Sequence, residues 1–318
     1  MTRNSLVRSF TLAVLAAAAA FAQSSADEIH TLQVRPNVYM LVGAGGNITA
    51  LVGADGVLLV DTGLARNAGQ VLAALRKLSG KPVMYILNTH VHADHVGGNE
   101  TIAATGSFPT GGNVAGDLAD AGQGAAIYAH ENVLERMSKP QSGFSFKAQP
   151  TETYHTDDLR LSPAFHFGEA VQMIHIPSAH TDGDSLVYFR RADVVVTGDI
   201  FTPGGYPFID LESGGSVNGV IAGLNKILDV AFPDFRLEGG TMIVPGHGRL
   251  CDIADVAYYR DMVTIIRDRV LDQIKKGKTL DQIKAARLTL DYDPRYGTVP
   301  GSSDRFLEAI YKSLTQKK

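Results

Sequence analysis

Short apolar runs separated by glycine turns dominate the first part of the chain. Such runs occupy residues 38–42, 48–52 and 57–60. Apolar runs of this length, bounded by turn residues, predict the strands of a β-meander. Apolar residues then recur at helical spacing from Leu64 to Leu78, which predicts a helix. The run at 83–87 predicts another buried strand.

The same order of strands and helices returns further along the chain. Strands are predicted at 126–129, 152–155, 158–161, 171–176, 185–190, 193–197 and 242–244. Helices are predicted at 131–138, 217–230 and over most of 254–318, and loops at the glycine-rich segment 105–124 and at 139–150. Strands and helices in two successive sets predict an α/β protein with two β/α halves that face each other.

The N-terminus has the pattern of an export signal. Arg3 and Arg8 precede an apolar run from Phe10 to Ala22, and Ala20-Phe21-Ala22 fits a small-x-small cleavage site. The run is shorter than the ~18–20 residues that span a bilayer. We therefore expect a signal peptide at 1–22, no membrane anchor after cleavage and a periplasmic or secreted protein. The expected mature chain has a main domain at 23–250 and a helical C-terminal extension at 251–318 packed on it.

Composition narrows the class of partner. The 318 residues include 29 Lys and Arg and 33 Asp and Glu, for a net charge of -4. Since no basic block stands out, nucleic acid is not an expected partner, and a small-molecule substrate is. The single cysteine, Cys251, excludes an intrachain disulfide. The fold must therefore be stabilised by its core or by a metal.

Carboxylates and imidazoles follow five of the predicted strands. In α/β sheets, ligands bind just beyond the carboxyl ends of the strands, so these side chains are expected to converge on one rim. They are Asp61 after 57–60, His90-x-His92-x-Asp94-His95 after 83–87, His180 after 171–176, Asp199 after 194–197 and His247 after 242–244.

The six-residue motif from His90 to His95 offers four metal ligands. On a tight turn, residues i and i+2 face one point, and residues i+4 and i+5 face a second point nearby. Four ligands so close together would crowd one ion but can serve two. Imidazole and carboxylate suit zinc, and two ions can share a bridging carboxylate.

These motifs resemble those of the metallo-β-lactamase-fold hydrolases. The resemblance covers about residues 31–250 and implies an αββα sandwich with two zinc ions per chain. His90, His92 and His180 would bind the first ion; Asp94, His95 and His247 would bind the second; Asp199 would bridge them, as in the glyoxalase II-like branch. Asp61 resembles the carboxylate that orients the motif loop, although a simple turn-forming Asp is a rival interpretation.

The resemblance implies hydrolysis by a zinc-bound hydroxide, with Asp94 as the catalytic residue that holds a proton and passes it to the leaving group. The substrate is expected to be a small ester, thioester, lactone or β-lactam. Tyr206, Phe208 and Ser216 follow Asp199 and are candidates to line the substrate pocket, or are turn and core residues.

Two alternatives keep the fold and change the chemistry. The first is a β-lactamase proper, although no lysine stands soon after Asp199 to bind the carboxylate of the drug. The second is a sulfur oxygenase with one iron ion, which the complete second set of Asp94, His95 and His247 disfavours. The remaining histidines match no family position and are expected to be structural or exposed: His30, His130, His155, His166 and His175.

Overall fold

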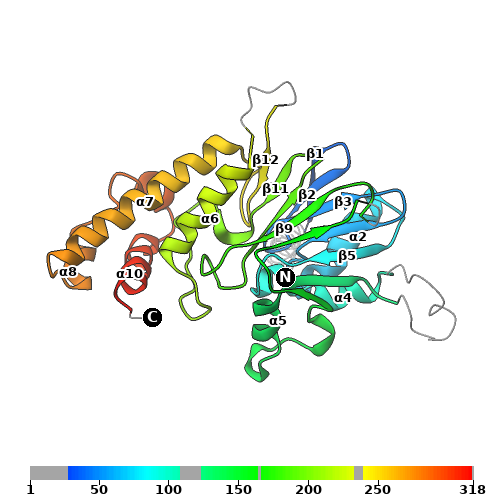
Figure 1. Ribbon diagram of the computed structural model, residues 1–318, viewed down its shortest axis with the longest axis horizontal. Helices are drawn as coiled ribbons and strands as arrows, with labels where there is room; N and C mark the ends of the chain where they lie inside the picture. Colours follow the sequence, from blue (N-terminus) through cyan, green and yellow to red (C-terminus); the bar gives the residue numbers. More distant parts are fainter. Residues whose placement is uncertain (1–27, 108–122, 164–165, 233–238, 317–318) are drawn as a thin grey trace, which may run out of the picture.

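The first of two sheets follows the order of the chain. The computed structural model describes residues 28–107, 123–163, 166–232 and 239–316 (Figure 1). Its seven-stranded sheet contains β1 (His30–Arg35), β2 (Val38–Val42), β3 (Ile48–Val52), β4 (Val57–Val60), β5 (Val83–Leu87), β6 (Ala126–His130) and β7 (Glu152–Tyr154). Strands β1 to β4 pair antiparallel and β4 to β7 pair parallel. The predicted meander is therefore confirmed, and β4 and β5 end at the same edge of the sheet.

The second sheet has five strands in the order β12-β11-β10-β9-β8. They are β8 (Asp158–Leu161), β9 (Val171–His175), β10 (Ser185–Phe189), β11 (Val194–Val196) and β12 (Met242–Val244). All neighbours pair antiparallel except β11 and β12, which are parallel. Because β11 and β12 run in the same direction, Asp199 and His247 emerge at the same edge.

Helices cover the outer face of each sheet (Figure 1). Helices α2 (Ala68–Leu78) and α4 (Asn99–Ala104) pack on the first sheet, through Val71, Leu75 and Ile102. Helices α6 (Val217–Val230) and α7 (Ile253–Lys275) pack on the second, and α10 (Ser302–Thr315) packs on both of them. The shorter helices are α3 (Ala93–Val96), α5 (Glu131–Met137), α8 (Leu280–Ala285) and α9 (Asp293–Tyr296).

The main core lies between the two sheets. Met40, Leu58 and Leu87 of the first sheet pack against Val187 and Phe189 of the second, and all five are fully buried. Burial of such apolar side chains contributes roughly 1.5–3 kcal/mol each relative to exposure. The layers are thus helix, sheet, sheet and helix, which confirms the predicted αββα sandwich with C-terminal helices.

Short elements account for most of the differences from the sequence prediction. The helix expected from Leu64 begins at Ala68, after the 3₁₀ turn η1 (Ala65–Asn67). The expected loop at 139–150 contains the 3₁₀ turns η2 (Pro140–Ser142) and η3 (Phe146–Ala148). Helices α3 and α4 were not predicted, because each is too short to show a helical period. The predicted signal peptide and most of the predicted loop at 105–124 lie outside the described residues.

None of the helices in the described part of the chain combines the length and the apolar character needed to cross a membrane.

Candidate metal centre

The six-residue motif follows β5 and leads into helix α3. His92 is the extended residue immediately before α3, and the first turn of that helix carries Asp94 and His95. Position 61, at the end of the parallel neighbour β4, anchors the start of the motif: the Thr89 amide donates to Asp61 Oδ1 at 2.8 Å. The sheet thus presents the motif at its carboxyl edge, as the sequence predicted.

The seven predicted ligands gather in two adjoining groups. In the first group, one ligand atom each from His90, His92, His180 and Asp199 lies within 4.8 Å of the others. His180 Nε2 is 2.9 Å from His92 Nδ1 and 3.8 Å from Asp199 Oδ2. His90, His95 and His180 are almost completely buried.

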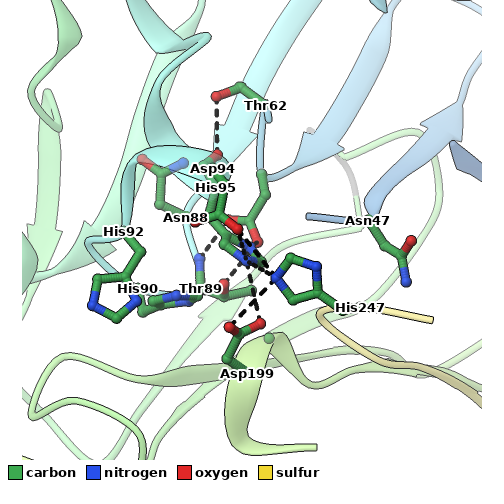
Figure 2. Close-up of polar contacts among 12 residues, drawn as sticks. Asn47, Thr62, Asn88, Thr89, His90, His92, Asp94, His95, Asp199 and His247 are labelled. Atoms are coloured by element: carbon green, nitrogen blue, oxygen red, sulfur yellow. Dashed lines mark hydrogen bonds and ion pairs between the residues drawn. The ribbon is translucent and has the colours of Figure 1, made fainter. Parts of the chain in front are cut away.

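The second group contains Asp94, His95 and His247. Figure 2 shows His247 pointing toward Asp94 and Asp199. His247 Nε2 lies 3.1 Å from Asp94 Oδ2 and 3.5 Å from Asp199 Oδ2. Because Asp199 Oδ2 is near both His180 and His247, this carboxylate lies between the two groups, where a bridging ligand would be.

Oxygen atoms orient the rings of His90 and His95 from behind. His95 Nδ1 donates to Asp61 Oδ2 at 2.8 Å. His90 Nδ1 donates to the Thr89 hydroxyl at 3.0 Å, and that hydroxyl in turn donates to Asp61 at 2.7 Å. In both rings an oxygen holds the Nδ1–H, so Nε2 is the nitrogen that faces the centre and would bind a metal.

The rings of His92 and His180 are held in the same manner. His180 Nδ1 donates to the Phe208 carbonyl at 2.8 Å, which leaves the Nε2 lone pair free. His92 is reversed: its Nε2 donates to Asp210 Oδ2 at 2.9 Å, and Nδ1 faces the centre. Four of the five histidines thus have their tautomer set by an oxygen outside the centre.

Two buried atoms of the first group have no hydrogen-bond partner among the described residues. They are His90 Nε2 and Asp199 Oδ1. A buried polar atom without a partner costs free energy, and each of these atoms can donate an electron pair to a cation. A cation in the group would satisfy them. The imidazole and carboxylate donors therefore fit a metal such as zinc, and the two groups fit a pair of ions.

Charges within the centre shift the titration of its members. Burial acts to lower the pKa of His95, but Asp199 and Asp61 beside it raise that pKa well above its ordinary value. Hydrogen bonds to Asp199 and Asp94 raise the pKa of His247 to about 9. Burial lowers the pKa of His90 well below its ordinary value. Metal binding must displace the protons held on His95 and His247, so the affinity for metal should rise with pH.

Glycines at positions 46 and 246 allow the loops that carry them to approach His95 and Asp199 closely. A Cβ on residue 246 would overlap Asp199 Oδ1, and a Cβ on residue 46 would overlap the ring of His95. Asn47 links the loop after β2 to the loop that carries His247. Its side-chain Nδ2 donates to the Pro245 carbonyl at 2.9 Å, and its backbone N–H donates to the Gly246 carbonyl at 2.7 Å. Figure 2 shows Asn47 beside the His247 loop.

Three residues of the site were missed by the sequence reasoning. Asp210 and Thr89 hold histidine rings, and Asn47 holds the loop of His247. Thr89 stands inside the motif, so its position was available as a signal. Asp210 and Asn47 lie far from their partners in the sequence, and only the fold brings them close. Asp61 contacts His95 Nδ1 at 2.8 Å, and its role as an orienting carboxylate stays a prediction.

Of the three candidate pocket residues, Phe208 is exposed beside the metal centre, whereas Tyr206 and Ser216 make hydrogen bonds within the fold. Phe208 is 64% exposed, and its ring centroid lies 6.0 Å from that of His92 and 5.7 Å from that of His180. Tyr206 is buried, and its hydroxyl donates to Asp293 at 2.9 Å. Ser216 caps helix α6: its hydroxyl accepts from the Gly219 amide and donates to the Ser178 carbonyl, so both of its hydrogen-bonding functions are used within the fold.

Cys251 and the other histidines lie outside the two groups. Cys251 is buried, its Sγ donates to the Arg249 carbonyl, and burial raises the pKa of its thiol to about 12. His130 and His175 stack on each other with ring centroids 3.6 Å apart. Neither ring is part of the two metal-binding groups found among the described residues.

Comparison with known proteins identifies the family. The model of the metallo-β-lactamase superfamily matches residues 41–249, about two thirds of the chain. The chain therefore belongs to the metallo-β-lactamase superfamily of hydrolases.

Two curated relatives and two solved structures illustrate the likeness. A linear primary-alkylsulfatase of Pseudomonas sp. (strain ATCC 19151) is 23% identical over 72% of this chain and 47% of its own. A probable metallo-hydrolase, YqgX of Bacillus subtilis (strain 168), is 24% identical over 65% of this chain and 87% of its own. A double mutant of the sec-alkyl sulfatase PisA1 superposes with a TM-score of 0.64 at 17% identity, over 90% of this chain and 50% of its own. The DIM-1 metallo-β-lactamase superposes with a TM-score of 0.54 at 14% identity, over 74% of this chain and 97% of its own.

These two alkylsulfatases are longer proteins. The chain spans about half the length of each of them.

Proposed function

We propose that the protein is an exported hydrolase that uses two zinc ions to cleave a small ester, thioester, lactone or β-lactam. One observation carries the proposal: four histidines each have one ring nitrogen held by an oxygen, and the other directed into the centre. Contacts of this kind fix the orientation of metal ligands and raise their basicity. A set of unrelated polar residues would not need them.

The two donor groups define which residues would hold each ion. His90, His92 and His180 would hold one, Asp94, His95 and His247 the other, and Asp199 would contact both. When bound, zinc lowers the pKa of a water molecule to about 7 and polarises the oxygen of the scissile bond.

Asp94 is the group that moves a proton. Its side chain is 34% exposed, against 12% for Asp199, so Asp94 Oδ2 can be reached from solvent and by a substrate. Burial acts to raise the pKa of Asp94, but the hydrogen bond from His247 and the positive charges of His95 and His247 together outweigh it, so the pKa is lowered. The carboxylate is therefore ionised at neutral pH. It accepts the proton of the attacking water and returns it to the leaving group.

A cavity of about 330 Å³ beside His92 supports a small substrate. Its volume is at the lower end of the range for small-molecule sites. Its walls combine apolar side chains, Val91 and Phe144 among them, with the cationic side chains of Arg136 and Lys139. A larger cavity of about 580 Å³ between Pro36 and Arg191 contains none of the seven candidate ligands.

Hydrolysis of sulfate esters is the second candidate function. The curated alkylsulfatase and the PisA1 structure both match a large part of this chain, and the PisA1 match covers 90% of it against 74% for DIM-1. A β-lactamase proper and an iron-dependent sulfur oxygenase are further outcomes of the same test. The complete donor set of the second group weighs against a single iron ion.

The test combines metal analysis with a substrate panel. Purified protein should contain about two zinc ions per chain and should cleave one class among a chromogenic β-lactam, a lactone, a thioester, a carboxylic ester and an alkyl sulfate. Asp94→Ala should retain the circular dichroism spectrum and lose at least ~100-fold in kcat, in line with the loss of a proton-transferring group. Asp229→Ala, an exposed change on α6, is the matched control. One iron per chain and an inert panel would contradict the proposal, as would near-normal turnover by Asp94→Ala.

Export is tested separately. The proposal rests on the pattern of residues 1–22, which lie outside the described residues. Expression in a bacterium with a periplasm should yield a fraction released by osmotic shock whose N-terminus begins after Ala22. An intact Met1 on all of the protein would contradict export.

A further inference from the structure

A second cavity lies beside the centre, between the segment that follows Asp199 and the C-terminal helix. This groove has a volume of about 360 Å³, and residues 206–211 form one wall and α10 the other. Its apolar lining includes Phe208, Ile209, Leu211, Phe306 and Ala309. Helix α10 lies beyond the part of the chain that matches the superfamily, which ends at residue 249.

Phe208 connects the groove to the metal centre. Phe208 lines the groove, and its ring faces the rings of His92 and His180. Its carbonyl fixes the His180 ring. The groove therefore borders a residue that contacts two of the candidate metal ligands.

The charge of the groove is opposite to that of the whole chain. Among the lining side chains, Arg305 and Lys312 are cationic and Glu308 is the single acidic one. Glu308 is held by two lysines, Lys284 at 2.7 Å and Lys312 at 2.6 Å, so it is more than neutralised. The net charge of the protein, by contrast, is -4.

Arg305 has unused capacity for an anion. Its Nη1 donates to the Pro300 carbonyl at 3.3 Å, and no carboxylate of the described residues lies within 4.0 Å of its guanidinium. Nearby, the buried hydroxyl of Ser302 also lines the groove and has no hydrogen-bond partner among the described residues. An apolar floor beside a guanidinium whose other N–H groups have no carboxylate partner is complementary to a chain that ends in an anion.

We propose that this groove binds the apolar chain of an amphipathic anionic substrate, whose ester lies at the metal centre and whose terminal carboxylate or sulfate is bound by Arg305. The inference rests on the proposed function and narrows its substrate class. It also gives the C-terminal extension a role in selecting the substrate.

The first test measures binding and does not depend on turnover. Suberate and octanoate have chains of equal length, and only suberate has a second carboxylate. Calorimetric titration of the metal-containing protein should show tighter binding of suberate. Arg305→Gln should weaken suberate binding ~10-fold, the loss of one charge-assisted hydrogen bond, and leave octanoate binding unchanged. Arg76→Gln, on an exposed position of α2, is the matched control.

The second test uses hydrolysis. For the mono-p-nitrophenyl ester of suberate, Arg305→Gln should raise KM ~10-fold with kcat unchanged, and for p-nitrophenyl octanoate neither constant should change. Equal affinity of the wild-type protein for suberate and octanoate would overturn the groove assignment, as would an Arg305→Gln variant that binds suberate normally. An inert substrate panel together with Arg305-dependent binding of suberate would overturn the hydrolase proposal and leave the groove assignment standing.

Discussion

The positions of some residues of the metal centre could be predicted from the sequence, and those of others could not. The seven candidate ligands follow predicted strands, so their convergence was predictable from the direction of those strands. Asp210 was not predictable, because it stands 118 residues from His92 and in no motif. It nevertheless holds the one ring of the first group whose Nδ1 faces the centre. The backbone N–H of Asp210 also donates to the His180 carbonyl at 2.9 Å, so Asp210 helps to position a second ligand of the first group.

Replacement of Asp210 tests this interpretation. In Asp210→Ala, His92 loses the acceptor that fixes its Nε2–H, so the ring is free to present the wrong nitrogen. We expect the affinity of the first group for zinc to fall about 10- to 100-fold, as for other partners of metal-bound histidines. Competition with a zinc-binding dye measures it. Glu212→Gln, two positions away and exposed, is the control and should bind normally. Equal affinity of the two variants would show that Asp210 does not orient His92.

At the scale of elements, the sequence predicted long periodic segments and missed short ones. The strands at 38–42, 48–52, 57–60 and 83–87 and the helix at 217–230 agree with the structure residue by residue. Helices α3 and α4 were not predicted, because their four and six residues are too few to show a helical period. Helix α5 was predicted, but the residue that caps it was not. His130 Nδ1 accepts from the Asn132 amide at 3.3 Å, which requires a neutral ring.

This cap makes the stability of the protein depend on pH. Burial and the stacked His175 lower the pKa of His130 to about 4, whereas an unfolded histidine titrates near 6.5. Between these values the unfolded chain binds more protons, so stability falls as the pH drops from about 6.5 toward 4. The loss from about pH 7 to pH 5 should be about 2 kcal/mol for this group.

A substitution separates the cap from the titration. His130→Asn keeps a side-chain acceptor at the cap and removes the ionisable ring. Urea unfolding at both pH values should show a smaller loss of stability in the variant than in the wild type. The same loss in both proteins would mean that His130 is already charged in the folded state.

At the scale of the whole molecule, the centre lies across the two halves of the sandwich. The first sheet supplies the motif and Asp61, and the second supplies His180, Asp199 and His247. The αββα arrangement was predictable from the order of elements and the motifs. The groove at α10 was not, because helical periodicity shows that a helix buries one face without showing which segment it packs on.

Metal removal should therefore destabilise the whole fold. A ligand that binds the native state at about 1,000 times its Kd adds about 4 kcal/mol of stability. We expect chelation of the ions to lower the Tm by about 10 °C in a domain of this size. Differential scanning calorimetry before and after verified removal measures the shift, and zinc should restore it. An unchanged Tm would show that the two halves are held together by their core alone.

The ring-to-ring contacts of the centre also describe a cross-link. His92 and His180 stand 88 residues apart in the chain, and His95 and His247 stand 152 apart. A tie between such distant points removes conformational entropy from the unfolded chain, and the amount grows with the length of the loop that it closes. The lone Cys251 rules out a disulfide within the chain for this purpose. The ions would then act as a reversible cross-link, which forms only after both sheets have come together and which is lost when acid protonates the histidine ligands.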